Sequence, residues 1–328
     1  MRGYGWMVSV AVLAACGGPM AGPGGGGGAD TAGAPGSGAP ADGTDGTAGD
    51  ADGADGADGA DGTDGTGGCP EGPLFALRWS DRDLTHAMLP GVVLEPAPGV
   101  TRVTEARLDE SLLLDLHFDA EARFSTITIQ ILDPGTGQVV TVFEDRLGWA
   151  DGRPAHEERW GGPSADALTR FERVEFTYDE EGRRSSATLR FDDGRPGTGL
   201  SWTWSGACLV SYDRDVSDSG PGWALACDGS DRATEVVPDI AEPGWRYHWP
   251  SPSADAAGPV AVDRGGPGAW TPAEEWTWDA SGSLVGAAFP DGSTDRWEAD
   301  AAGTPVRRVR VAPDGSERTL TTWAVSCD

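Results

Sequence analysis

Residues 125–143 read STITIQILDPGTGQVVTVF, and this stretch decides the fold. Polar and apolar residues alternate over Ser125–Ile131, and Val139–Phe143 is rich in β-branched residues. Alternation with a period of two predicts a strand with one buried face. Asp133–Gly137, between the two segments, combines Asp, Pro and Gly, which favour a turn. The stretch therefore predicts an antiparallel hairpin.

The same pattern returns near the end of the chain. Val306–Val311 and Arg318–Trp323 have strand character and flank the turn residues Pro313–Ser316. Long helical patterns are missing, and the best helix candidate is a short turn at Ala165–Leu168. We therefore expect a mainly β fold of antiparallel hairpins arranged as a meander.

An internal repeat joins these hairpins. An aromatic residue precedes an Asp, a Gly follows, and an Asp-Gly or Asp-Pro-Gly turn comes 12 to 14 residues after the first Asp. The copies begin at Leu116–Phe124, Phe176–Arg183, Trp276–Leu284 and Asp300–Gly303. Asp and Gly at these positions form turns, and aromatics at alternate positions pack across strands.

These copies resemble the YD (Rhs) repeat family over residues 115–145, 171–213 and 274–325. The sequence departs from the family pattern at Ala122, which replaces Gly, at Trp278, which replaces Tyr, and at Ala299, which replaces the aromatic residue. The resemblance implies an antiparallel sheet of divergent YD-repeat-like units. Four copies are too few for a large encapsulating shell, and the resemblance implies no chemistry.

The N-terminus carries an export pattern. Trp6–Ala15 is a ten-residue apolar segment after Arg2, too short to cross a bilayer and typical of a signal peptide. Leu13–Cys16 resembles the lipobox of bacterial lipoproteins; the alternative is an ordinary signal peptide followed by an incidental Cys. The resemblance implies that residues 1–15 are removed, that Cys16 is acylated and that its partner is a lipid bilayer. Gly17, where many inner-membrane lipoproteins have Asp, favours the outer membrane.

Residues 16–68 form a separate segment. After Cys16 it contains only Gly, Ala, Asp, Thr, Pro, Ser and one Met, from which no hydrophobic core can be built. The triplet run Ala51–Gly65 contains no Pro, which disfavours a collagen-like triple helix. We expect a disordered, acidic Gly/Ala/Asp-rich stalk that precedes a β-rich globular domain at residues 69–328.

Four cysteines remain in that domain once Cys16 is assigned to lipid. An even number in an exported protein predicts two disulfides, with three possible pairings. We favour Cys208 with Cys227, which closes a short loop, and Cys69 with Cys327, which joins the ends of the domain.

Composition excludes several functions. The chain has no Lys and a formal net charge of −29, so Lys-dependent phosphate loops and nucleophiles are absent and nucleic-acid binding is disfavoured. His156–Trp160 lacks the second His of a zinc-hydrolase motif. We predict no cofactor, metal ligand or catalytic residue, and carboxylate pairs are uninformative in so acidic a chain.

Tryptophan is the remaining signal, with 14 residues in the chain. Trp245, Tyr247 and Trp249 fall in a Pro-rich stretch outside the repeat, which we expect to be a loop and which is the best candidate for an exposed ligand platform. Core packing is the competing explanation. We expect a non-enzymatic structural, adhesive or interaction role on the envelope, with a polysaccharide or a surface protein as the partner. The alternatives are a module that binds polysaccharide through exposed Trp, and a hydrolase without a recognisable motif.

Overall fold

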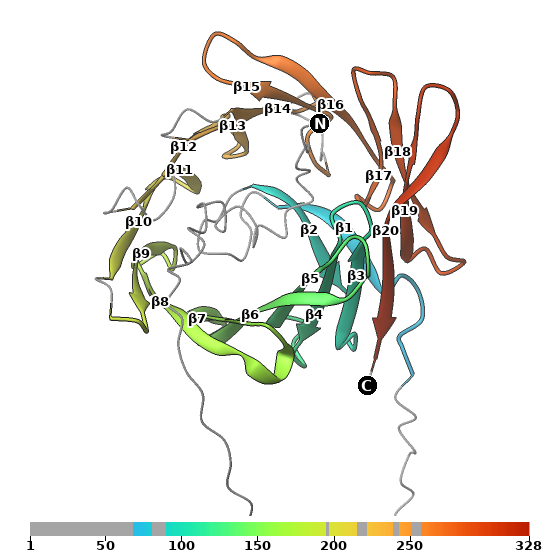
Figure 1. Ribbon diagram of the computed structural model, residues 1–328. Coiled ribbons are helices and arrows are strands. Elements are labelled where there is room, and N and C mark those ends of the chain that lie inside the picture. Colours follow the sequence, from blue (N-terminus) through green and yellow to red (C-terminus); the bar gives the residue numbers. More distant parts are fainter. Residues whose placement is uncertain are drawn as a thin grey trace, which may run out of the picture. The chain divides into compact units, whose positions relative to one another are not determined.

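A computed structural model describes residues 68–80, 90–194, 197–214, 222–238, 243–250 and 257–327 (Figure 1). These ranges contain one 3₁₀ turn, η1 (Ala165–Ala167), and no α-helix. The strands of the first half are β1 (Phe75–Ser80), β2 (Gly91–Pro96), β3 (Arg102–Arg107), β4 (Leu112–Phe118), β5 (Phe124–Leu132), β6 (Val139–Ala150), β7 (Arg153–Gly162), β8 (Thr169–Tyr178), β9 (Arg184–Phe191) and β10 (Thr198–Ser205). Those of the second half are β11 (Cys208–Arg214), β12 (Trp223–Cys227), β13 (Ala233–Pro238), β14 (Gly244–His248), β15 (Ala261–Gly265), β16 (Thr271–Trp278), β17 (Leu284–Ala288), β18 (Thr294–Ala299), β19 (Pro305–Val311) and β20 (Glu317–Ser326).

Strands β3 to β20 form one closed antiparallel sheet (Figure 1). Each strand pairs with the strand before it and the strand after it in sequence, and β20 returns to pair with β3, where Trp323 lies opposite Glu105. One side of the sheet carries the buried residues, such as Val103, Leu114 and Tyr212. A closed sheet encloses its inner face, so the side that carries these buried residues is the inner face.

The hairpin β1–β2 is a separate two-stranded sheet that covers part of the inner face. Phe75 of β1 contacts Trp323 of β20, with ring centroids 6.1 Å apart. Trp79 contacts three rings of the wall, those of Tyr247, Trp249 and Trp276, at 4.8 to 5.9 Å. The hairpin therefore supplies apolar side chains that help to fill the interior of the barrel.

One turn type joins many of the strands. The backbone N–H of a leading Asp donates to the carbonyl of the fourth residue after it, and the N–H of the third residue donates back to the Asp carbonyl. The Asp carboxylate also accepts the N–H of that fourth residue at 2.8 to 3.2 Å. The leading residues are Asp119, Asp179, Asp228, Asp279 and Asp300. We call these the Asp turns.

The third residue after the Asp has a positive φ in every Asp turn. Gly182, Gly282 and Gly303 adopt this conformation without steric cost. Ala122 and Asp231 adopt it at φ 59° and 60°, where Asp is tolerated better than most residues. The turn at Asp228 is not visible in the sequence pattern because it lacks both the Gly and the preceding aromatic residue, which is Cys227 here.

Three of the Asp turns hold a tryptophan that lies on, or directly after, a nearby strand. The turn Arg lies over the indole ring, and the indole N–H donates to the carbonyl of the residue after that Arg at 2.7 to 2.8 Å. The pairs are Arg123 with Trp149, Arg183 with Trp204, and Arg232 with Trp249. They recur every four strands, on the turns β4–β5, β8–β9 and β12–β13. We call them the Arg–Trp clasps.

The next turn in this series, between β16 and β17, has Ser283 where the others have Arg. The hairpin β1–β2 contacts the barrel here: the Leu77 N–H donates to Ser283 Oγ at 3.2 Å, and the Arg78 guanidinium donates to the Ser281 carbonyl. The absence of the clasp Arg thus coincides with the place where the hairpin docks.

Most of the sequence expectations for this domain are confirmed. The two predicted hairpins are β5–β6 and β19–β20, and the short helical segment is the single turn η1. The disulfides join Cys69 to Cys327 and Cys208 to Cys227. The predicted stalk lies outside the described residues. No helix in the described ranges is long and apolar enough to cross a membrane.

One expectation about local structure is wrong. The stretch that contains Trp245 and Trp249 is not a loop outside the repeat, because Gly244–His248 forms β14 and pairs with β13 and β15. Trp249 then takes part in the third Arg–Trp clasp. Two Pro residues flank the strand and gave the stretch its loop-like composition.

The inner face also carries buried charges. Arg159 lies 2.9 Å from Glu157, 3.3 Å from Glu172 and 3.6 Å from Asp145. Desolvation raises the pKa of Asp145 to about 7; the charge of Arg159 opposes this rise, and the neighbouring carboxylates add to it. Three acids thus lie around the buried Arg159. Ionisation of all three places like charges close together, which costs free energy.

This cluster predicts a pH-dependent stability. A carboxyl group with a folded-state pKa above its unfolded value of about 4 stabilises the fold at low pH, and this contribution is lost as the pH rises through the folded-state pKa. We expect the free energy of unfolding in urea to fall between pH 4 and pH 7, and Asp145→Asn to flatten that slope. An unchanged slope in Asp145→Asn would contradict this assignment.

Candidate functional site

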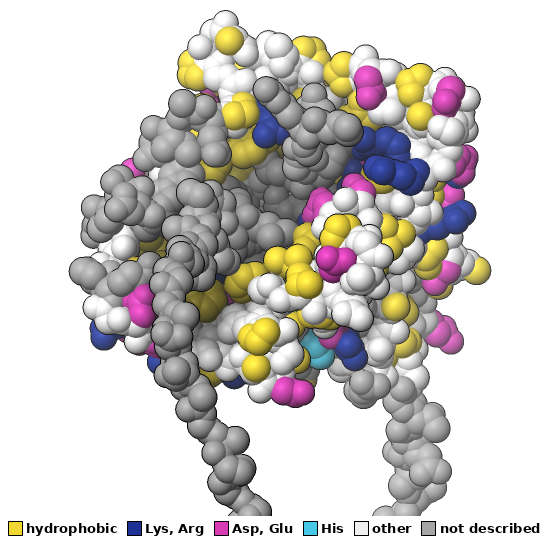
Figure 2. Space-filling view, in the orientation of Figure 1, with side chains coloured by type: hydrophobic (Ala, Val, Ile, Leu, Met, Phe, Trp, Pro, Cys, Tyr) yellow, Lys and Arg dark blue, Asp and Glu magenta, His cyan; other side chains and the backbone are white. Residues whose placement is uncertain are grey.

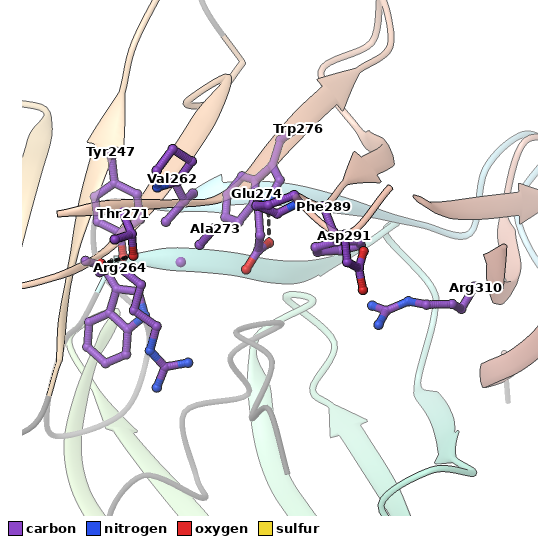
Figure 3. A pocket seen from close by; sticks show the side chains of 14 residues that line it. Tyr247, Val262, Arg264, Thr271, Ala273, Glu274, Trp276, Phe289, Asp291 and Arg310 are labelled. Atoms are coloured by element: carbon purple, nitrogen blue, oxygen red, sulfur yellow. Dashed lines mark hydrogen bonds between the residues drawn. The ribbon is translucent and has the colours of Figure 1, made fainter. Parts of the chain in front are cut away.

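A cavity of about 400 Å³ lies on the inner face of strands β14 to β16 (Figure 3). The first residue of β2, Gly91, forms part of its lining, and the β17–β18 turn and β19 complete it. The volume falls in the range of ~300–1,000 Å³ that is usual for small-molecule sites. The cavity therefore lies where the docked hairpin meets the barrel wall.

Aromatic rings form much of the lining. Tyr247 and Trp276 are 4% and 8% exposed and belong to the hydrophobic core. Trp245 is half-buried and stacks on Trp223, with centroids 5.4 Å apart and an interplanar angle of 29°. Phe289 lines the cavity from the β17–β18 turn. These rings give a ligand apolar faces held in position by the core.

Two carboxylates point into the same space (Figure 3). The indole N–H of Trp276 donates to Glu274 Oε2 at 2.6 Å. Desolvation raises the pKa of Glu274, although this hydrogen bond favours its charged form. Asp291 accepts hydrogen bonds from the Ser293 hydroxyl at 2.6 Å and the Ser293 N–H at 2.8 Å, which lower its pKa. The surroundings thus raise the pKa of Glu274 and lower the pKa of Asp291.

Two arginines complete the polar lining, at opposite ends of the cavity (Figure 3). Arg310 lies over the Phe289 ring at 4.4 Å and pairs with the buried Asp295 at 2.5 Å. Arg264 lies over the Trp245 ring at 5.9 Å. Hydrogen-bond donors, acceptors and aromatic faces therefore converge on one space.

The structure separates the three residues of the predicted platform. Trp245 and Tyr247 line the cavity, so they do share a site, but the site is concave and Tyr247 is buried. Trp249 does not line it; its indole N–H is bonded to the Ala233 carbonyl and its ring contacts Trp79. Trp249 therefore has a packing role.

The polar residues of the cavity were missed by sequence reasoning. Glu274 and Asp291 are two acids among the 53 in the chain, and Arg264 belongs to no motif. Trp276 was visible as a repeat aromatic, and Glu274 two residues earlier lies on the same face of β16. The two-residue spacing of Glu274 and Trp276 was therefore the sequence signal that could have placed Glu274 beside the ring.

The other predicted sites have simpler outcomes. Cys16 lies outside the described residues, and Cys69, Cys208, Cys227 and Cys327 form the two disulfides. Among the residues that the structure describes, no group of three or more His, Cys, Asp or Glu side chains is arranged to hold a metal ion.

Comparisons with known proteins give structural similarity alone. No protein-family model and no curated protein matches the chain. A porin-like protein from Bacteroides uniformis is similar at a TM-score of 0.34 and 9% identity, over 70% of this chain and 99% of that one. The TcdB2-TccC3-Cdc42 structure gives a TM-score of 0.31 and 11% identity, over 76% of this chain and 16% of that one. Similarities this weak support no inference about function.

Trp245 of β14 and Trp249, which directly follows this strand, should differ in their effect on stability. Trp249→Phe removes a hydrogen bond to the Ala233 carbonyl and a clasp, so we expect it to lower the free energy of unfolding by about 1 kcal/mol or more. Trp245→Phe keeps a ring against Trp223 and should have a smaller effect. Urea unfolding measures both. A larger loss for Trp245→Phe would contradict the assigned roles.

Proposed function

We propose that this chain is a lipid-anchored protein of the outer membrane whose β domain binds a saccharide in the cavity beneath β14 to β16. The single observation that carries the proposal is the lining itself, in which Trp245, Tyr247 and Trp276 share one cavity with the inward-pointing Glu274 and Asp291. The role is one of binding, and the rest of the barrel holds the site in place.

Saccharides fit this chemistry because their rings have both apolar and polar sides. The C–H side of a sugar ring packs on indole and phenol rings. Its hydroxyl groups donate hydrogen bonds to carboxylates and accept them from guanidinium groups. An apolar ligand would desolvate the polar groups of Glu274, Asp291 and Arg264 without adding hydrogen bonds to them, which costs free energy.

The envelope location rests on the N-terminal sequence. The signal-like segment 1–15, Cys16 and Gly17 support an acylated protein sorted to the outer membrane, and segment 16–68 supports a stalk between lipid and domain. The recurring Asp turns support the assignment of the domain to a divergent branch of the YD (Rhs) repeat family.

A second function is favoured by one specific observation. The pKa of Glu274 is raised by desolvation, whereas that of Asp291 is lowered by the Ser293 hydrogen bonds. Glycoside hydrolysis uses two carboxyl groups, an acid whose pKa is raised and a second group that stays ionised. Release of reducing ends from a bound oligosaccharide, lost in Glu274→Gln, would assign this activity.

Acylation has a direct test. In a Gram-negative host that is fed radiolabelled palmitate, we expect the full chain to be labelled and to fractionate with the outer membrane. Cys16→Ser should abolish the label, because Cys16 is the acceptor thiol of the lipobox. Cys69→Ser should retain it, because Cys69 is part of a disulfide. Label that persists in Cys16→Ser would contradict lipid anchoring.

Saccharide binding also has a direct test. We expect titration of the detergent-solubilised chain with neutral and acidic oligosaccharides to change its tryptophan emission saturably, because Trp245 and Trp276 line the cavity. Trp245→Ala should weaken binding by about tenfold or more, which corresponds to the loss of one stacking ring.

Trp270→Ala is the matched control. Trp270 also lies under a guanidinium group, that of Arg246 at 4.7 Å, but it does not line the cavity, so binding should be unchanged. If no saccharide binds the folded chain, or if both variants weaken binding equally, the proposed function is wrong. A structural or adhesive role would then remain.

A further inference from the structure

The charges of the cavity differ from those of the domain around it. After residue 68 the chain has 44 acids and 23 arginines, an excess of acids of almost two to one. The cavity lining has two acids, Glu274 and Asp291, and two arginines, Arg264 and Arg310. Figure 2 shows arginine side chains gathered on the right-hand part of this face, over β17 to β19. The cavity is therefore much less negative than its surroundings.

The charge of Arg310 is balanced within the protein. Arg310 pairs with Asp295, whose side chain is fully buried and is also held by Arg308. The Asp291 carboxylate points toward the Arg310 guanidinium at the same end of the cavity (Figure 3). A ligand anion would gain little from an arginine that already faces two carboxylates.

Arg264 differs from Arg310 because, among the residues that the structure describes, its charge is not paired: no carboxylate there lies within 4 Å of its guanidinium. The side chain extends into the cavity at the end opposite Arg310 (Figure 3). Its guanidinium lies on the Trp245 ring, which orients it. The planar fork of donors of an Arg matches a carboxylate in a two-bond arrangement.

We propose, on the basis of the saccharide-binding function above, that the ligand is a carboxylated saccharide of the uronate type, whose carboxylate pairs with Arg264 while its ring packs on Trp245. The hydroxyl groups of the sugar then face Glu274 and Asp291. Because this protein has a high net negative charge, it repels an anionic ligand at long range. The positive charge of Arg264 in the cavity offsets this repulsion.

The experiment compares two disaccharides that differ at the sixth carbon of each sugar, where one has carboxylates and the other has hydroxymethyl groups. Isothermal titration of the solubilised full chain with α-1,4-linked digalacturonate, and with the neutral galactose disaccharide of the same linkage, measures the two dissociation constants. We expect digalacturonate to bind about tenfold or more tightly, and the difference to shrink at high salt.

Variants of Arg264 assign the effect to one residue. Arg264→Gln should remove the difference in affinity between digalacturonate and the neutral disaccharide, and Arg264→Lys should restore part of that difference. Arg246→Gln is the matched control, since Arg246 also lies over a Trp but pairs with Glu235 and lies outside the cavity lining. It should bind both disaccharides normally.

The outcomes separate this inference from the function on which it rests. Equal binding of both disaccharides, unchanged in Arg264→Gln, would overturn the carboxylate assignment and leave saccharide binding in place. Tighter binding of a sulfated galactose disaccharide than of digalacturonate would also overturn it. Failure of every saccharide to bind would reject both.

Discussion

The carboxylate of the Asp turn is the interaction on which the rest of this structure depends. Its oxygen accepts the N–H of the fourth residue after it and thereby fixes the turn that reverses the chain. Every connection in the closed sheet joins strands that are neighbours in sequence, so a turn that reverses wrongly would break the sheet at that point. The Arg–Trp clasps then tie the turn to a neighbouring strand every fourth strand.

Closure of the sheet creates an interior that the wall residues fill incompletely. The β1–β2 hairpin supplies Phe75, Leu77 and Trp79 to that interior, and the disulfide from Cys69 to Cys327 ties the chain before the hairpin to the end of the barrel. Where β2 begins, at Gly91, the lining has no side chain beyond hydrogen, and the cavity lies there. The β1–β2 hairpin thus completes the core and, at Gly91, leaves open the cavity in which we place a ligand.

Sequence reasoning succeeded where the signal is local. The hairpins at 125–143 and 306–323 are set by alternation and turn residues within about twenty positions, and the disulfides by an even count and the ends of the domain. Closure was not predicted, because the pairing of β20 with β3 joins residues at opposite ends of the barrel and has no local pattern. Trp249 was misplaced because its clasp partner Arg232 belongs to a turn in which Cys227 replaces the aromatic residue of the repeat and Asp231 replaces its Gly. Arg264 and Glu274 acquire meaning only from the cavity that brings them together.

The most direct test of this account is a crystal structure of the protein bound to digalacturonate. The account predicts a sugar ring against Trp245 and a carboxylate whose oxygens lie about 3 Å from the Arg264 guanidinium, with the Asp turns and the hairpin in place around it. A ligand bound elsewhere on the barrel, or one whose carboxylate faces away from Arg264, would contradict it.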